Sequence, residues 1–110
     1  MSDFNSFRFG FVGLGLIGGS IAKAIRSYWP MAEIIAYNPS RDTLDEAIHD
    51  GVVNAGACSK DGPLDGALFK NCDIVFLCAP VQKNAENLAA LKGHLKPSAI
   101  LSDIGSTKRD

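Results

Sequence analysis

The sequence predicts an α/β fold, a doubly wound parallel sheet with helices on both faces. Short apolar segments rich in β-branched residues alternate with stretches of helical periodicity, in the order βαβαβαβαβ. Parallel strands joined by right-handed crossovers leave few possible arrangements. Among these we expect the strand order 3-2-1-4-5, which puts the first strand in the centre of the sheet.

The five expected strands are short apolar runs bounded by turn residues. The fourth is apolar almost throughout, which is typical of a strand covered on both faces. In chain order the strands are Phe7–Val12, Glu33–Tyr37, Asn54–Cys58, Asp73–Cys78 and Ala99–Leu101.

Four helices are expected between these strands. The first has its apolar residues at helical spacing, and Pro30 lies just beyond its end. Ser40 is the expected N-cap of the second helix, and Gly51 is placed to stop it. The helices span Leu16–Tyr28, residues 41 to about 49, Pro63–Phe69 and Asn84–Leu95.

The composition is typical of one soluble globular domain. Of the 110 residues, 46% are apolar and 21% are charged. The net charge is −1 and no stretch gathers enough Lys and Arg to neutralise several phosphates, which argues against a nucleic-acid partner. No apolar run is long enough to span a membrane, and the N-terminus lacks a secretory signal. Cys58, Cys72 and Cys78 lack metal-ligand spacing, and the last two are expected as buried apolar residues of a cytoplasmic protein.

A glycine motif, GLGLIG at residues 13–18, follows the first strand. A strand precedes it, a helix opens in its second half, and the second strand ends twenty residues later, which is the context of a dinucleotide-binding loop. Gly13 allows a tight turn, Gly15 lets the backbone approach a pyrophosphate, and Gly18 lets the helix pack closely on the sheet. The N–H groups at the helix start then face the phosphates. The sequence therefore predicts a Rossmann-type domain that binds a nicotinamide dinucleotide.

The loop continues into Gly19 and Ser20. The Ser20 hydroxyl either donates a hydrogen bond to a phosphate or is merely tolerated at a crowded helix start. Cofactor contacts are expected from Gly13, Gly15, Leu16, Ile17, Gly18, Gly19 and Ser20.

The end of the second strand bears on which dinucleotide binds. NAD-binding domains usually have an acidic residue here, which binds the ribose hydroxyls, but this chain has Asn38. Without that carboxylate a 2′-phosphate is not repelled, and Ser40 and Arg41 could bind one. The alternative is that Ser40 only caps the helix and Arg41 is solvated. Asn38, Ser40 and Arg41 are expected to contact the cofactor. We expect this cofactor to be NAD or NADP, with a modest preference for NADP or dual use.

Two further strand ends lie on the same edge of the predicted sheet. Ala79 and Pro80 follow the fourth strand, where a small and a rigid residue would let the dinucleotide pass closely. Ser106 follows the fifth strand near the expected nicotinamide position, although it would equally serve as an N-cap. His49 and His94 are explained by their expected places at helix ends, and no metal site is predicted.

Several segments together are similar to the prephenate/arogenate dehydrogenase family of tyrosine biosynthesis. The residues that resemble it run from about residue 7 to the last residue. They are GLGLIGGS at residues 13–20, IAY at 35–37, CAPV at 78–81, LKP at 95–97 and SDIGSTK at 102–108.

The resemblance implies an oxidative decarboxylation. In this family a hydride passes from the hydroxyl-bearing ring carbon to the nicotinamide, and loss of carbon dioxide makes the ring aromatic. Prephenate then gives 4-hydroxyphenylpyruvate, and arogenate gives tyrosine. The resemblance assigns the phosphate loop to residues 13–20 and the cofactor-lining turn to Ala79 and Pro80. It assigns to Ser106 the orientation of substrate and catalytic histidine.

The family's catalytic histidine comes after the motif at residues 102–108, and its helical C-terminal domain follows. We therefore expect residues 1–110 to be a dinucleotide-binding domain that binds cofactor but does not turn over alone. The full-length protein is expected to be a homodimer acting on a small molecule, prephenate or arogenate. Alternatives are the cofactor domain of a β-hydroxyacid dehydrogenase or pyrroline-carboxylate reductase, and a non-catalytic NAD(H)-sensing module.

Overall fold

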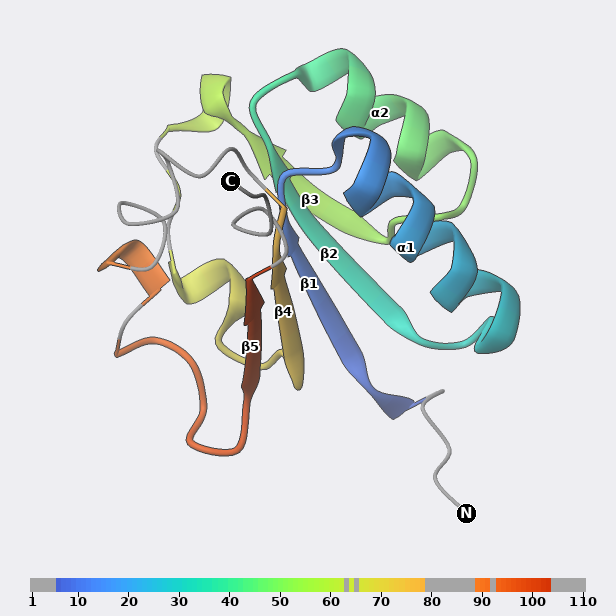
Figure 1. Cartoon of the computed structure of the whole chain (residues 1–110). Coiled ribbons are helices and arrows are strands. Elements are labelled where there is room, and N and C mark those ends of the chain that lie inside the picture. Colours follow the sequence, from blue (N-terminus) through green and yellow to red (C-terminus); the bar gives the residue numbers. More distant parts are fainter. Residues whose placement is uncertain (1–5, 63, 65, 79–88, 92, 104–110) are drawn as a thin grey trace, which may run out of the picture.

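A parallel five-stranded sheet with the order β3-β2-β1-β4-β5 forms the centre of the molecule (Figure 1). The computed structural model describes residues 6–62, 64, 66–78, 89–91 and 93–103, with only the backbone for 15–17 and 103. Every neighbouring pair of strands is parallel. The predicted α/β class and strand order are thus confirmed. The strands are β1 (Arg8–Val12), β2 (Glu33–Asn38), β3 (Ala55–Cys58), β4 (Ile74–Leu77) and β5 (Ile100–Asp103).

Two α-helices lie side by side on one face of the sheet (Figure 1). They are α1 (Gly15–Tyr28) and α2 (Arg41–His49), close to their predicted limits. Ser40 is the N-cap of α2, because its Oγ accepts a hydrogen bond from the Thr43 N–H at 3.3 Å. The 3₁₀ turns η2 (Ser59–Asp61) and η3 (Gly66–Phe69) follow β3.

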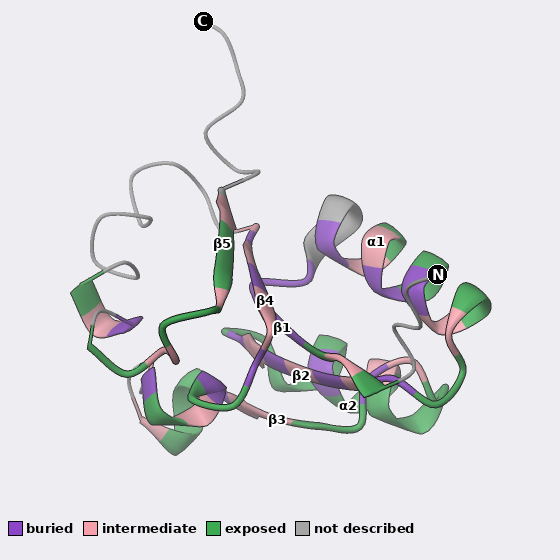
Figure 2. Ribbon diagram, turned by 90° about the horizontal axis from the view of Figure 1, so that it is seen from below, coloured by how far each residue is buried: buried purple, intermediate pink, exposed green. Residues whose placement is uncertain are grey.

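The hydrophobic core has one part on each face of the sheet. Phe11 and Ile34 pack beneath α1 and α2, together with Leu44 of α2. On the opposite face Val75 packs with Phe69 of η3. Figure 2 shows that burial is concentrated in the inner strands and on the side of α1 facing the sheet, whereas the edge strand β5 is largely exposed. The sheet is therefore covered on both faces, as predicted.

The fourth predicted helix ends earlier than expected. Residues 89–91 are helical, but 93–95 form a turn, and the predicted start at residues 84–88 lies outside the described residues. Gly93 has φ = +86°, a conformation that ends helices and that few other residues adopt. Leu95 still packs on the core from this turn, so its apolar character extended the predicted helix wrongly. His94 consequently lies in the turn and not in the last helical turn.

The remaining differences from the predicted elements are small. The predicted helix Pro63–Phe69 is the shorter η3, with residues 63 and 65 outside the described part of the chain. The other element limits differ by at most two residues. None of the helices that the structure describes is long and apolar enough to span a bilayer.

The end of the sheet opposite the glycine loop is held by Asp73, just before β4. Its Oδ2 accepts the Arg8 N–H at 2.8 Å, and its Oδ1 is bonded to Lys96 Nζ. Desolvation alone would raise the pKa of Asp73, but the hydrogen bonds from Lys96 and Arg8 outweigh it and lower that pKa. This carboxylate therefore connects β1, β4 and the turn before β5.

Candidate functional site

The glycine loop lies between the central strand β1 and the start of α1. The chain turns at Gly13, whose φ of +92° favours glycine. The Gly13 N–H donates to the Tyr37 carbonyl at 2.7 Å, so the loop stays attached to the end of β2. Helix α1 begins two residues later, with Leu14 at its N-cap and no acidic residue in its first turn. This end of α1 thus has no carboxylate of its own to oppose an anion.

Gly18 is the point of closest approach between α1 and the loop. A Cβ on Gly18 would lie 2.6 Å from the Gly13 carbonyl oxygen and 3.3 Å from the Cys78 Cβ. Such a contact is far inside van der Waals distance, so only glycine fits. A Cβ on the neighbouring Gly19 would meet nothing within 4 Å. The tight turn predicted at Gly13 and the close packing predicted at Gly18 are both confirmed.

Asn38 connects this loop to the turn after β2. Its side chain is buried, and Oδ1 accepts the Leu14 N–H at 2.9 Å while Nδ2 donates to the Ser40 carbonyl at 3.1 Å. From the sequence, Asn38 was predicted to contact the cofactor in place of the usual carboxylate, but its bonds to Leu14 and Ser40 were not predicted. Asn-Pro after a strand does signal a turn, but the bond to a residue 24 positions earlier depends on the sheet order.

Arg41 begins α2 at the same edge of the sheet and is engaged by two carboxylates. Its Nε lies 3.3 Å from Asp45 Oδ1, and its Nη1 lies 3.3 Å from Asp61 Oδ2. Nη1 also lies 3.7 Å from the buried Cys58 Sγ. Both members of the Arg41–Asp61 pair are about half exposed. Arg41 is thus exposed and paired with two carboxylates, and its contact with a 2′-phosphate stays a prediction.

Asp61 belongs to η2 and was not anticipated from the sequence. Its Oδ2 accepts the Cys58 N–H at 3.0 Å. The hydrogen bonds from the Cys58 amide and thiol lower the pKa of Asp61, and the nearby Arg41 adds to this effect. The only local signal would have been an acidic residue three positions after a strand end, which is a common turn feature.

The other predicted cofactor residues are described in part or not at all. Ser20 is exposed on α1, and for residues 15–17 only the backbone is described, in the first turn of that helix. Ala79, Pro80 and Ser106 lie outside the described residues. Of the strands that lead to them, β4 ends beside β1 at the pair Val12–Leu77, and β5 ends beside β4 at the pair Leu77–Asp103. The cofactor and catalytic roles of all these residues remain predictions.

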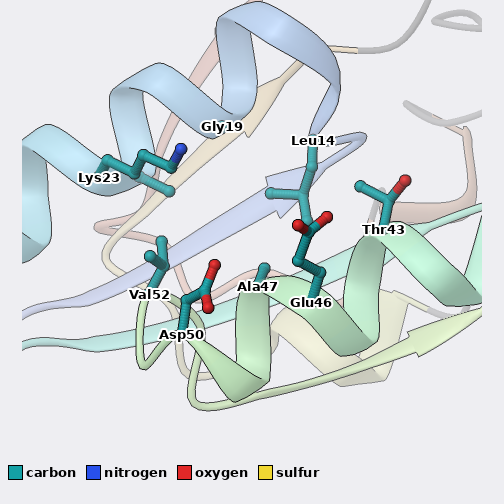
Figure 3. A pocket seen from close by; sticks show the side chains of 9 residues that line it. Leu14, Gly19, Lys23, Thr43, Glu46, Ala47, Asp50 and Val52 are labelled. Carbon is teal, nitrogen blue, oxygen red and sulfur yellow. The ribbon is translucent and has the colours of Figure 1, made fainter.

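A groove of about 190 Å³ lies between α1 and α2 (Figure 3). Lys23 of α1 and Glu46 of α2 are at its sides, and Ala47 and Val52 give it an apolar part. The groove reaches the glycine loop at Leu14 and Gly19 but does not include Asn38, Ser40 or Arg41. No group of three or more potential metal ligands occurs among the residues described.

The topology identifies the class of protein. The crossover through α1 and the connection from β3 to β4 lie on opposite faces of the sheet, so the glycine loop stands at the point where the strand order reverses. Ligands of open α/β sheets bind there, and a glycine loop leading into a helix is the pyrophosphate site of a Rossmann-type dinucleotide-binding domain.

The family follows from comparison with known proteins. The sequence profile of the family described as "Prephenate dehydrogenase, nucleotide-binding domain" matches residues 21–110. The chain belongs to this family. The resemblance found in the sequence is thus confirmed.

Two curated relatives agree with this assignment. The chain is 35% identical over 97 residues to cyclohexadienyl dehydrogenase of Zymomonas mobilis, covering 88% of the chain and 31% of the relative. It is 34% identical over 98 residues to prephenate dehydrogenase of Bacillus subtilis, covering 88% and 25%. The chain therefore spans between a quarter and a third of the length of these relatives.

Solved structures show the same similarity. Synechocystis arogenate dehydrogenase superposes with a TM-score of 0.76 and 32% identity, covering 93% of this chain and 34% of that one. Prephenate dehydrogenase from A. aeolicus, solved in complex with hydroxyphenyl propionate and NAD⁺, gives a TM-score of 0.74 and 25% identity, covering 89% and 33%. The relatives are dehydrogenases, and this domain corresponds to part of each.

Proposed function

We propose that the chain is the cofactor-binding domain of an NAD(P)-dependent dehydrogenase that oxidatively decarboxylates prephenate or arogenate in tyrosine biosynthesis. The observation that carries the proposal is the close approach of Gly18 to the Gly13 carbonyl, where a Cβ would lie 2.6 Å from the oxygen, in a chain of this family. When bound, the nicotinamide accepts the hydride whose removal from the substrate ring accompanies loss of carbon dioxide. We propose a cytoplasmic location, where cysteines stay reduced.

The residues of the chain bind and position the cofactor in this proposal. The backbone N–H groups of residues 13–20 and the positive end of α1 hold the pyrophosphate, with the Ser20 hydroxyl donating a further hydrogen bond. Ala79 and Pro80 line the path of the dinucleotide. Ser106 lies near the nicotinamide and orients the substrate and a histidine that follows this chain. In the whole protein, a helical domain completes the substrate pocket and forms a homodimer.

The preferred cofactor in this proposal is NADP, with use of NAD as well. It is supported by the absence of a carboxylate at Asn38, whose side chain is occupied by the loop and by Ser40. It is also supported by the half-exposed guanidinium of Arg41, whose N–H groups suit a phosphate although one of them is paired with Asp61. The Ser40 Oγ accepts the cap bond from Thr43, which leaves its own hydrogen available to a ligand.

Titration of the 110-residue chain with NADPH and with NADH tests the cofactor site directly. We expect both to bind, NADPH more tightly, with quenching of Trp29 fluorescence or calorimetry as the readout. Tighter binding of NADH would overturn the preference for NADP. Failure of both to bind would overturn the proposed domain function.

The reaction is tested on the whole protein with prephenate and arogenate, each with NAD⁺ and NADP⁺. We expect reduction of the nicotinamide with one or both substrates and none with the 110-residue chain alone. Turnover of a β-hydroxyacid or a pyrroline carboxylate would instead favour another dehydrogenase. Tight cofactor binding by a whole protein without any activity would favour a sensing module.

A further inference from the structure

We infer that Asp61 is a specificity-determining residue that weakens binding of a 2′-phosphorylated cofactor by holding Arg41 and by standing beside the phosphate position. The inference rests on the proposed function, because it requires the adenosine ribose to lie at the end of β2. It concerns a residue that follows β3, and not the residues after β2 that such domains commonly use.

Asp61 and Arg41 meet because β2 and β3 end side by side. The last residues of these strands, Asn38 and Cys58, are register partners. Arg41 follows β2 by three residues and Asp61 follows β3 by three, so both side chains lie at the carboxyl edge of the sheet. This edge is where a cofactor ribose is bound in such domains. The ion pair at 3.3 Å therefore stands in the region where a 2′-phosphate would be recognised.

The position of Asp61 is fixed from several sides. Its Oδ2 accepts the Cys58 N–H at 3.0 Å. The same turn is attached to the end of β2 by the Ser59 hydroxyl, which donates to the Pro39 carbonyl at 3.0 Å. The Tyr37 hydroxyl donates to the Gly62 carbonyl at 2.9 Å. The turn is thus attached to the end of β2, and the carboxylate is held beside Arg41 by the Cys58 N–H.

A 2′-phosphate competes with this arrangement, whereas a free 2′-hydroxyl does not. A phosphate that binds Arg41 either replaces Asp61 at Nη1 or binds another N–H of the guanidinium. In both cases the Asp61 carboxylate lies a few ångströms away. Two negative charges at such a distance repel each other even near the protein surface. A cofactor with an unmodified ribose leaves the Arg41–Asp61 pair intact. Asp61 therefore lowers the affinity for the phosphorylated cofactor selectively.

The test is calorimetric binding of 2′,5′-ADP and 5′-ADP to the 110-residue chain and to its Asp61→Asn variant. The amide oxygen of Asn can still accept the Cys58 N–H, so the turn is retained, and circular dichroism verifies the fold. At low salt we expect Asp61→Asn to bind 2′,5′-ADP about fivefold more tightly. A factor of this size corresponds to the loss of one exposed ion pair that competes with the phosphate. The affinity for 5′-ADP should not change.

Asp45→Asn is the matched control, since Asp45 also pairs with Arg41 at 3.3 Å. Asp45 projects from the exposed surface of α2, and its only described bond is to Arg41, so it can turn away from a ligand. We expect a clearly smaller gain from Asp45→Asn. In an Arg41→Gln background the gain from Asp61→Asn should fall, because the competition for the guanidinium is gone.

Three results would overturn the inference. Weaker binding of 5′-ADP by Asp61→Asn would make Asp61 a ribose ligand. Equal gains in 2′,5′-ADP affinity from Asp45→Asn and Asp61→Asn would show that only the loss of a negative charge matters, and not the position of Asp61. Unchanged 2′,5′-ADP affinity in a folded Asp61→Asn variant would show that Asp61 does not compete with the 2′-phosphate for Arg41. Failure of the unmodified chain to bind either nucleotide or either dinucleotide would instead overturn the proposed function, and the inference with it.

Discussion

At the scale of single residues, two adjacent glycines have different reasons to be glycine. Gly18 lies against the Gly13 carbonyl, where no Cβ fits, whereas Gly19 faces open space. The motif at residues 13–18 was recognisable in the sequence because its spacing reflects local geometry. The open surroundings of Gly19 were not recognisable, because they depend on what the first turn of α1 faces.

Alanine substitution should have different effects at these two glycines, because a Cβ would be crowded at Gly18 and unobstructed at Gly19. Gly18→Ala should lower the free energy of unfolding by about 1–3 kcal/mol, because the helix must move away from the loop. It should also weaken NADPH binding. Gly19→Ala should leave stability unchanged or raise it by about 0.5–1 kcal/mol, as alanine favours helix. Urea unfolding followed by circular dichroism measures both, and equal effects of the two substitutions would contradict the assignment.

Polar side chains that bond over long sequence distances were the part of the site that the sequence did not reveal. Ser40 was predicted as an N-cap from its neighbours alone, and the structure confirms it. The bond from Leu14 to Asn38 and the ion pair of Arg41 with Asp61 each join residues at least 20 positions apart. Such pairs form only once β1, β2 and β3 stand in order, so composition and spacing carry no signal for them.

At the scale of elements, the order of the strands and their parallel direction could be predicted from the sequence, but the end of one helix could not. Alternation of apolar runs with helical periodicity predicted β1 to β5 within two residues. The helix containing residues 89–91 was extended wrongly to Leu95, because an apolar residue in a turn resembles one on a helix. Gly93, two residues earlier, was the available signal for the end of this helix.

The carboxylate of Asp73, which bonds to Arg8 of β1 and to Lys96, makes the stability of the fold dependent on pH. Its pKa is lowered in the folded chain, so it stabilises the fold above the unfolded value of about 3.9. This contribution is lost as the pH falls through the lower, folded pKa. Asp73→Asn should therefore destabilise the chain at pH 7 and make little difference at a pH below both values. Guanidinium unfolding at the two pH values measures this.

Lys96→Met provides the complementary variant for Asp73. Without the ammonium group, the folded pKa of Asp73 should lie closer to its unfolded value, because the bond from Arg8 then acts alone against desolvation. The stabilising contribution at neutral pH should shrink, and the acid-induced loss should be smaller and be complete at a higher pH than in the unmodified chain. An identical pH profile for the two proteins would exclude Lys96 as the cause.

At the scale of the whole molecule, the reversal of strand order at β1 concentrates the candidate site at one edge of a single domain. The glycine loop, the Arg41–Asp61 pair and the ends of β4 and β5 all belong to this edge. The sequence predicted this convergence, because the ends of parallel strands share an edge. It could not predict the connections between the turns, which depend on how the turns pack.

Cofactor binding should stabilise the whole domain, since every contact of the proposed site exists only in the folded chain. NADPH at 100 times its dissociation constant should add about 2.7 kcal/mol and raise Tm by roughly 10–20 °C. Nicotinamide riboside lacks the pyrophosphate and at the same concentration should leave Tm unchanged. Differential scanning calorimetry with each ligand measures the shift. Equal shifts for the two ligands would contradict binding through the glycine loop.

The central place of β1 also has a consequence for how the chain folds during synthesis. β1 is synthesised first, but one of its two neighbours in the sheet is β4, which is synthesised much later. The Arg8 N–H donates to the Asp73 carboxylate, which lies 65 residues further along the chain. At about 5–20 residues per second, several seconds of translation separate the two. Until then one edge of β1 is open, and such distant pairings also slow folding itself. The strand that later supports the glycine loop is therefore the one exposed to wrong partners for longest.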